Sequence, residues 1–173
     1  MRRSTRAGIP GEMFKVPLED GSARVAQVLA IHWDAFQEPI CAFTLVTHED
    51  WTIGAGITLD DVMAVQTVTS DLLRTRPQVW KVFDSRPPLF VSEDVLTAPE
   101  RRWLQDPHTR TLVPSTNPMV IGSGLMTDFL EACLGLRPWD EYAWPEYNDG
   151  VLLPGRARPA AAYMGDRHRG TCA

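Results

Sequence analysis

The densest group of acid–base side chains in this sequence is the triplet His48-Glu49-Asp50. A general acid and a general base need pKa values that a cleft has pushed apart. Adjacent residues in a turn are usually solvated, so the same triplet is typical of an exposed turn. Two interpretations stay open: a small hydrolase that uses these residues in a pocket, and a solvated turn, which the spacing favours.

Other metal ligands and nucleophiles are scattered along the chain. The four histidines stand far apart and outside any HxH or HExxH pattern, whereas a metal site needs ligands that converge. Three cysteines, an odd number at wide spacing, argue against a disulfide framework or a zinc site. Gly122-Ser123-Gly124 lacks the full G-x-S-x-G pattern of a nucleophile elbow. We therefore expect no metal, no cofactor and no catalytic residue, and we expect Cys41 and Cys133 to be buried thiols.

The elements that would position these groups follow from hydrophobic periodicity. Glu12–Leu18 alternates between apolar and polar residues, which predicts a half-buried strand that Pro17 ends or places at an edge. Asp20-Gly21 supplies the positive-φ residue of a tight hairpin. We predict further strands at 23–33, 40–47 and 78–83, an extended segment at 51–57 after the turn at 48–50, and a short helix at 59–65 that Thr58 caps.

The C-terminal half differs in composition from the N-terminal half. Prolines are frequent after Arg86, and Thr97-Ala-Pro-Glu100 resembles a capping box that would start a helix to about residue 105. The strongest helix prediction is Ser123 to Gly135, where an apolar stripe lines one face and the glycine ends the helix. Four aromatic residues follow, and packing of a tail is favoured for them over an exposed recognition surface: Trp139, Tyr142, Trp144 and Tyr147.

Charge is distributed unevenly. Residues 1–9 and 154–173 each carry a net charge of +3, whereas 10–153 hold 10 basic and 21 acidic residues, a net charge of −11. An acidic body disfavours nucleic acid and favours a basic partner, although many soluble proteins are simply acidic. A nucleic-acid-binding barrel that uses its basic tails stays open as an alternative. No stretch approaches roughly 18 apolar residues and no apolar segment follows the first arginines, so we expect no membrane span, no signal peptide and a cytoplasmic protein.

Two segments of the chain resemble the immunity protein 26 family of bacterial polymorphic-toxin systems. The first is Gly11-Glu-Met-Phe-Lys-Val-Pro-Leu-Glu-Asp-Gly21, followed by the apolar strand Val25 to Leu29. It is similar to the family pattern of a glycine, two residues, alternating apolar residues, Pro-Leu-x-Asp-Gly and a strand. The second is Thr58-Leu-Asp-Asp-Val62, which resembles the family's short helix. The resemblance covers roughly residues 10–95.

The resemblance implies an α+β fold, a small SH3-like β-barrel with a helical C-terminal extension. The resemblance implies the barrel at 10–95 and the extension packed on it at 96–153. Composition separately predicts a flexible N-terminus at 1–9 and a disordered tail at 154–173. The implied function is an immunity protein that binds a cognate toxin, such as a basic nuclease, and occludes its active site. Acids in turns and one aromatic residue are our candidate partner-binding residues: Asp34, Glu38, Glu49, Asp50, Trp51, Asp60 and Asp61. A solvated acidic face is the alternative for these acids.

Overall fold

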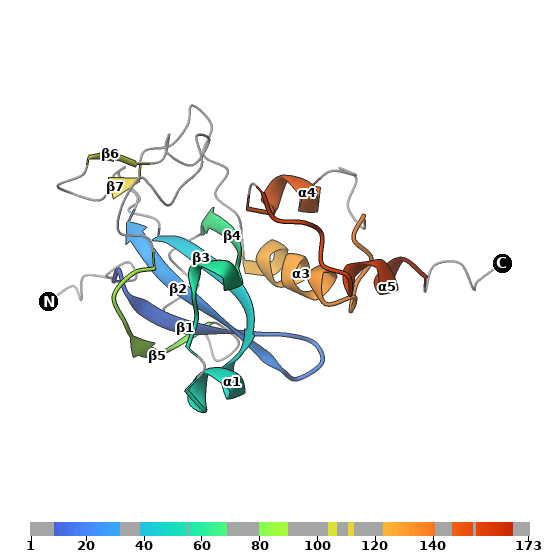
Figure 1. Cartoon of the computed structure of the whole chain (residues 1–173), viewed down its shortest axis with the longest axis horizontal. Coiled ribbons are helices and arrows are strands. Elements are labelled where there is room, and N and C mark those ends of the chain that lie inside the picture. The colour runs from blue at the N-terminus through green and yellow to red at the C-terminus, as the bar shows by residue number, and fades with distance from the viewer. Residues whose placement is uncertain are drawn as a thin grey trace, which may run out of the picture.

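Five antiparallel strands form the main sheet in the computed structural model, which describes residues 9–31, 39–54, 56–68, 80–89, 104–106, 111–112, 123–140, 147–153 and 155–167. The strands are β1 (Glu12–Pro17), β2 (Ala23–Ile31), β3 (Pro39–Thr47), β4 (Val62–Thr67) and β5 (Lys81–Ser85). Their order across the sheet is β4-β3-β2-β1-β5 (Figure 1). A separate two-stranded hairpin consists of β6 (Leu104–Asp106) and β7 (Thr111–Leu112).

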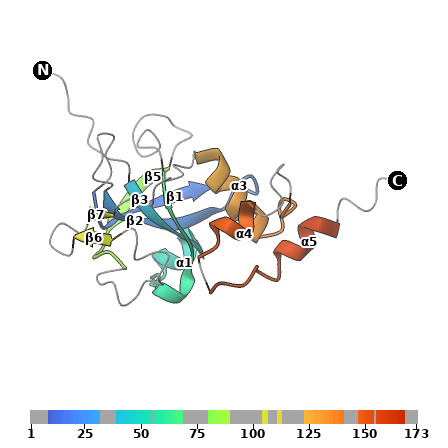
Figure 2. The ribbon, with the colours of Figure 1, turned by 90° about the horizontal axis from the view of Figure 1, so that it is seen from above.

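Short helices accompany the sheet. They are α1 (His48–Thr52), the 3-10 turn η1 (Leu59–Asp61), α3 (Ser123–Cys133), α4 (Tyr147–Val151) and α5 (Ala162–Arg167). Figure 2 shows α3, α4 and α5 grouped beside the sheet, with α1 at a different place on its margin. An antiparallel sheet with a few short helices confirms the α+β prediction.

The main core lies between one face of the sheet and α3. Phe14 of β1 stacks on Trp80 with ring centroids 5.3 Å apart, and Phe43 of β3 meets the edge of both rings. The apolar stripe of α3 lies in the same core, with Phe129 and Leu130 fully buried. Burial of a side chain of this size contributes roughly 1.5–3 kcal/mol, so this contact helps to hold α3 on the sheet. The helix predicted from Ser123 is confirmed, and Gly135 follows it with a φ of +73°.

The connection from β3 to β4 differs from its prediction. The triplet at 48–50 begins α1, because the Thr47 hydroxyl accepts the Asp50 N–H at 3.0 Å and so caps a helix. The helix predicted at 59–65 is only the turn η1, and Val62 begins β4. Val62 and Ala64 are buried against β3, so pairing with a neighbouring strand overrides the local helix signal.

The other strand predictions are confirmed with shifted ends. β2 ends at Ile31 within the described residues, and the strand expected at 78–83 is β5, which ends just before Arg86. The helix expected to run to about 105 is wrong at its end, because Leu104 begins β6. Its earlier residues lie outside the described ones.

The tail expected to be disordered from 154 packs on the body where it is described. Arg156 donates from Nε to the Val62 carbonyl at 2.9 Å and from Nη2 to the Leu59 carbonyl at 2.7 Å. Ala162 of α5 is buried in the main core. Composition predicted disorder because this segment is small and basic, but these directed backbone contacts offset the loss of chain entropy.

The aromatic segment before the tail is packed where it is described. Trp139 is buried, and its indole N–H donates to Asp149 at 3.1 Å. This confirms packing for Trp139, whereas Tyr142, Trp144 and the side chain of Tyr147 lie outside the described residues. No helix among the described residues is long and apolar enough to cross a membrane.

Candidate partner-binding surface

The short helix α1 places acids and an aromatic ring next to each other. Its first turn carries Glu49 and Asp50, both exposed, and Trp51 follows half-buried. Asp50 is also structural, since its carboxylate accepts the Thr47 hydroxyl at 2.7 Å. Glu49 offers its side chain to solvent, so of the two predicted acids it is the better candidate for contact with a partner.

Edge strand β5 supplies the other half of an aromatic cluster. The Phe83 ring meets His48 edge-on with centroids 4.6 Å apart and meets Trp51 at 6.0 Å. The Arg86 guanidinium lies 5.4 Å from the centre of the Trp51 ring and pairs with Asp84 at 3.0 Å. The strand therefore joins α1 through ring contacts and a cation–π contact.

Two aliphatic side chains close in sequence to this cluster face solvent. Ile53, just after α1, is 82% exposed, and Val82 of β5 is 42% exposed. We name the α1–β5 surface by its members: His48, Glu49, Trp51, Ile53, Val82, Phe83, Asp84 and Arg86. Exposed aliphatic residues beside half-buried aromatic rings, with charges at the rim, are typical of protein-binding surfaces.

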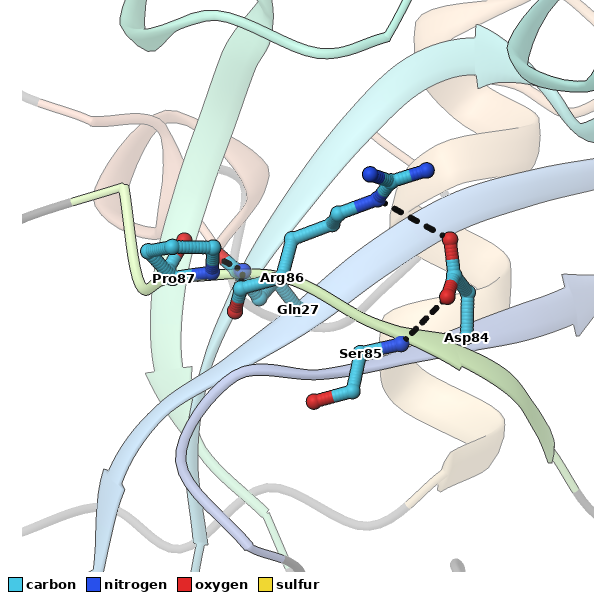
Figure 3. A network of polar contacts seen from close by, with 5 residues as sticks. All are labelled: Gln27, Asp84, Ser85, Arg86 and Pro87. Atoms are coloured by element: carbon cyan, nitrogen blue, oxygen red, sulfur yellow. Dashed lines mark hydrogen bonds and ion pairs between the residues drawn. The ribbon is translucent and has the colours of Figure 1, made fainter.

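A buried glutamine fixes the segment that carries Arg86. The Gln27 amide donates to the Arg86 and Pro87 carbonyls at 3.2 and 3.1 Å (Figure 3). Its oxygen accepts the Leu89 N–H at 2.9 Å. Three hydrogen bonds of this one side chain are thus directed at the segment from Arg86 to Leu89. They fix the backbone that carries Arg86 of the α1–β5 surface.

A glycine lets the same segment approach β1 closely. Gly11 has a φ of +98°, and its carbonyl accepts the Arg86 N–H at 2.9 Å. A Cβ at Gly11 would lie 2.5 Å from the Arg86 carbonyl oxygen, closer than real contacts allow. The glycine at position 11 of the sequence pattern therefore has a structural role: it allows β1 and the Arg86 segment to approach each other next to the α1–β5 surface.

The electrostatics of His48 suit packing better than proton transfer. Burial lowers the pKa of His48, the nearby Lys15 lowers it further, and Glu49 opposes both. The imidazole is thereby kept neutral against the Phe83 ring. Glu49 and Asp50 are exposed rather than enclosed with it, so the geometry does not favour the hydrolase interpretation of this triplet.

The second predicted acid pair lies on η1. The Asp61 carboxylate accepts the Thr58 N–H at 2.6 Å and the Thr58 hydroxyl at 2.9 Å, which makes it a cap. The Asp60 side chain is 97% exposed, with Arg156 Nη2 4.0 Å away. Asp60 is therefore available to a partner although its charge is partly offset. Asp34 and Glu38 lie outside the described residues.

The described residues do not form a metal site or a reactive thiol. The described parts of the chain hold no group of three or more His, Cys, Asp or Glu side chains that could bind a metal ion. Cys41 and Cys133 are free and buried as predicted, and burial raises the pKa of both thiols, that of Cys133 to about 12. Such thiols stay protonated and unreactive near neutral pH.

Sequence reasoning missed half of the surface. Phe83 was included in a predicted strand, but nothing in the sequence pairs that strand with β1 and so brings it to α1. Arg86 carried a weak signal for its position, since it stands directly before Pro87-Pro88, where a strand must end.

Neither a family model, a curated protein nor a solved structure matches this chain.

Proposed function

We propose that this chain is an immunity-type protein that binds a cognate bacterial toxin in the cytoplasm and blocks its active site. The observation that carries the proposal is the α1–β5 surface, where Ile53 and Val82 face solvent beside the Trp51–Phe83 cluster. An enzyme would instead be expected to enclose its titratable groups. The resemblance of residues 11–29 and 58–62 to the immunity protein 26 family supports the same proposal, as does the curled sheet, which fits an SH3-like barrel.

The chemistry of the surface defines the partner. Trp51 is suited to anchor a contact, because tryptophan is among the side chains that carry most of the binding energy of an interface. Ile53 adds exposed apolar surface that a partner can bury. Glu49 at the rim would attract a basic cleft, such as that of a nuclease, and would raise the association rate. Asp60 and the net charge of −11 over 10–153 act in the same direction over a longer range.

The test is the growth of cells that express the toxin encoded beside this protein. We expect the wild-type chain to rescue growth, and Ile53→Asp and Glu49→Lys to lose rescue, because both side chains are exposed and neither change disturbs the core. Asp140→Lys, a matched change at an exposed acid after α3, should keep rescue. Equal killing with and without the wild-type protein would overturn the proposal. Loss of rescue in the Asp140 variant alone would move the contact away from the α1–β5 surface.

A further inference from the structure

Arg24 is a charged side chain enclosed in the sheet. It lies near the start of β2, opposite Val16 of β1 and Thr47 of β3, and only 8% of its surface is exposed. Its Nε and Nη1 atoms are buried without a hydrogen-bond partner in the part of the chain that the structure describes. This observation is independent of the toxin proposal.

An enclosed guanidinium without acceptors is unfavourable. Arginine cannot discharge itself by losing a proton at physiological pH, unlike a buried lysine or carboxyl group. An uncompensated buried charge costs several kcal/mol, so proteins normally give it an acceptor. The positive charge of Arg24 at this position is therefore not compensated by an acceptor, and a bound anion would stabilise it.

The strand partners of Arg24 do not supply an acceptor for its guanidinium. Val16 has no acceptor in its side chain, and the Thr47 hydroxyl is bonded to Asp50. One acid that senses the Arg24 charge is Asp20: its pKa is lowered chiefly by hydrogen bonds from Ser22 and to a smaller degree by the Arg24 charge. Asp20 is thus held by Ser22, at 2.6 and 2.8 Å, rather than by the guanidinium.

We propose that Arg24 is the anchor of a carboxylate-binding site at the hairpin end of the sheet. A planar guanidinium binds a carboxylate through two parallel N–H···O bonds. In its enclosed position the Arg24 side chain makes no hydrogen bond through Nε or Nη1. Turning toward a ligand at its exposed margin therefore breaks no hydrogen bond of these two atoms. The neighbouring acid Asp20 repels a phosphate dianion about twice as strongly as a carboxylate, which favours the single charge. The carboxylate comes either from a small acid or from an Asp, Glu or C-terminus of a bound protein.

The test uses the NMR signal of the Arg24 Nε–H group in the intact protein. Acetate, inorganic phosphate and a short peptide with one Asp and blocked termini are titrated at constant ionic strength, with chloride as the reference. We expect a saturable shift of the Arg24 signal with acetate and the peptide, and a smaller one with phosphate, while the Arg86 signal does not saturate. Tighter binding of the peptide than of acetate identifies a protein carboxylate as the source, and equal binding identifies a small acid. No saturable shift, or a stronger response to phosphate than to acetate, overturns the proposal.

A variant gives an independent readout. Arg24→Met removes the enclosed charge, so in chloride buffer it should melt at a higher temperature than the wild type, and acetate should no longer raise its melting temperature. Lys81→Met, at an exposed cation, should keep the acetate effect. A lower melting temperature for Arg24→Met together with an undiminished acetate effect contradicts the proposal. The NMR titration decides the question in the wild-type protein even where this variant fails to fold.

Discussion

The two edges of the main sheet are treated differently by the rest of the chain. At the β4 edge the Leu153 N–H donates to the Met63 carbonyl at 2.7 Å, and Arg156 occupies the carbonyls of Val62 and Leu59. At the β5 edge the pairing with β1 is bulged, and Val82 faces solvent. The first edge is closed by the chain's own polar groups. The second presents side chains, and its bulge discourages addition of a further strand.

This difference assigns separate roles to the two edges. The C-terminal segment stabilises the molecule by donating hydrogen bonds to the carbonyls of Met63, Val62 and Leu59, which would otherwise be without a partner in the sheet. The β5 edge, with α1, carries the surface for which we propose recognition by side chains rather than by backbone hydrogen bonds. Three substitutions or titrations probe this division, and they are ordered here by the size of the expected effect.

The largest effect is expected from Gly135→Ala, at the covered side of the molecule. Gly135 has a φ of +73°, and a Cβ there would collide with the Ala161 carbonyl that precedes α5. Left-handed backbone and overpacking together should lower the free energy of unfolding by about 3 kcal/mol. Urea denaturation measures the loss, and proteolysis should cut the segment at 155–167 first.

Gly21→Ala is the matched control for this substitution. Gly21 has a φ of +83° with no atom within 4 Å of its would-be Cβ, so only backbone strain applies. We expect it to cost about 1 kcal/mol. Equal losses in the two variants would show that the backbone before α5 does not press on Gly135.

An intermediate effect is expected from Gln27→Leu, beneath the α1–β5 surface. The change leaves the carbonyls of Arg86 and Pro87 and the N–H of Leu89 without their partner, which should cost about 2–3 kcal/mol. Hydrogen exchange at Leu89 should accelerate more than exchange in α3. Gln66→Leu, at a half-exposed position of β4, is the control and should change stability by less than about 0.5 kcal/mol. Similar losses in both would mean that Gln27 does not hold this segment.

The smallest effect is the pH response of His48. Because its pKa is lowered in the folded state, the unfolded chain binds more protons just below the ordinary value of 6.5. Stability from this group is therefore complete above pH 6.5 and is lost as the pH falls through the folded pKa. Comparison of the wild type with His48→Gln in urea between pH 7.5 and 5.5 should show this component only in the wild type. An imidazole that titrates by NMR at or above 6.5 would contradict its packing against Phe83.

The sequence predicted those elements whose signals are local and regular. The alternation of β1 and the apolar stripe of α3 each span enough residues to show a period. The five residues of α1 are too few for this, and their helix depends on one cap at Thr47. β4 was hidden because Thr58 and its two aspartates signal a helix start, while pairing with β3 decides the outcome after a single turn.

The candidate surface was predictable only in part for the same reason. Glu49 and Trp51 are neighbours in sequence, so they could be singled out together. Phe83 and Arg86 join them through the pairing of β5 with β1, which no local pattern encodes. Arg24 gave no signal at all, because an arginine in a strand is commonly exposed and only the packed structure shows that it is enclosed.

The most direct test of the division between the edges is hydrogen–deuterium exchange of this protein, alone and saturated with the toxin that we propose as its partner. Our account predicts slower exchange at 48–54 and 81–86 in the complex, with 147–153 and 155–167 unchanged. Protection confined to the C-terminal segments and β4, with α1 and β5 unaffected, would contradict it.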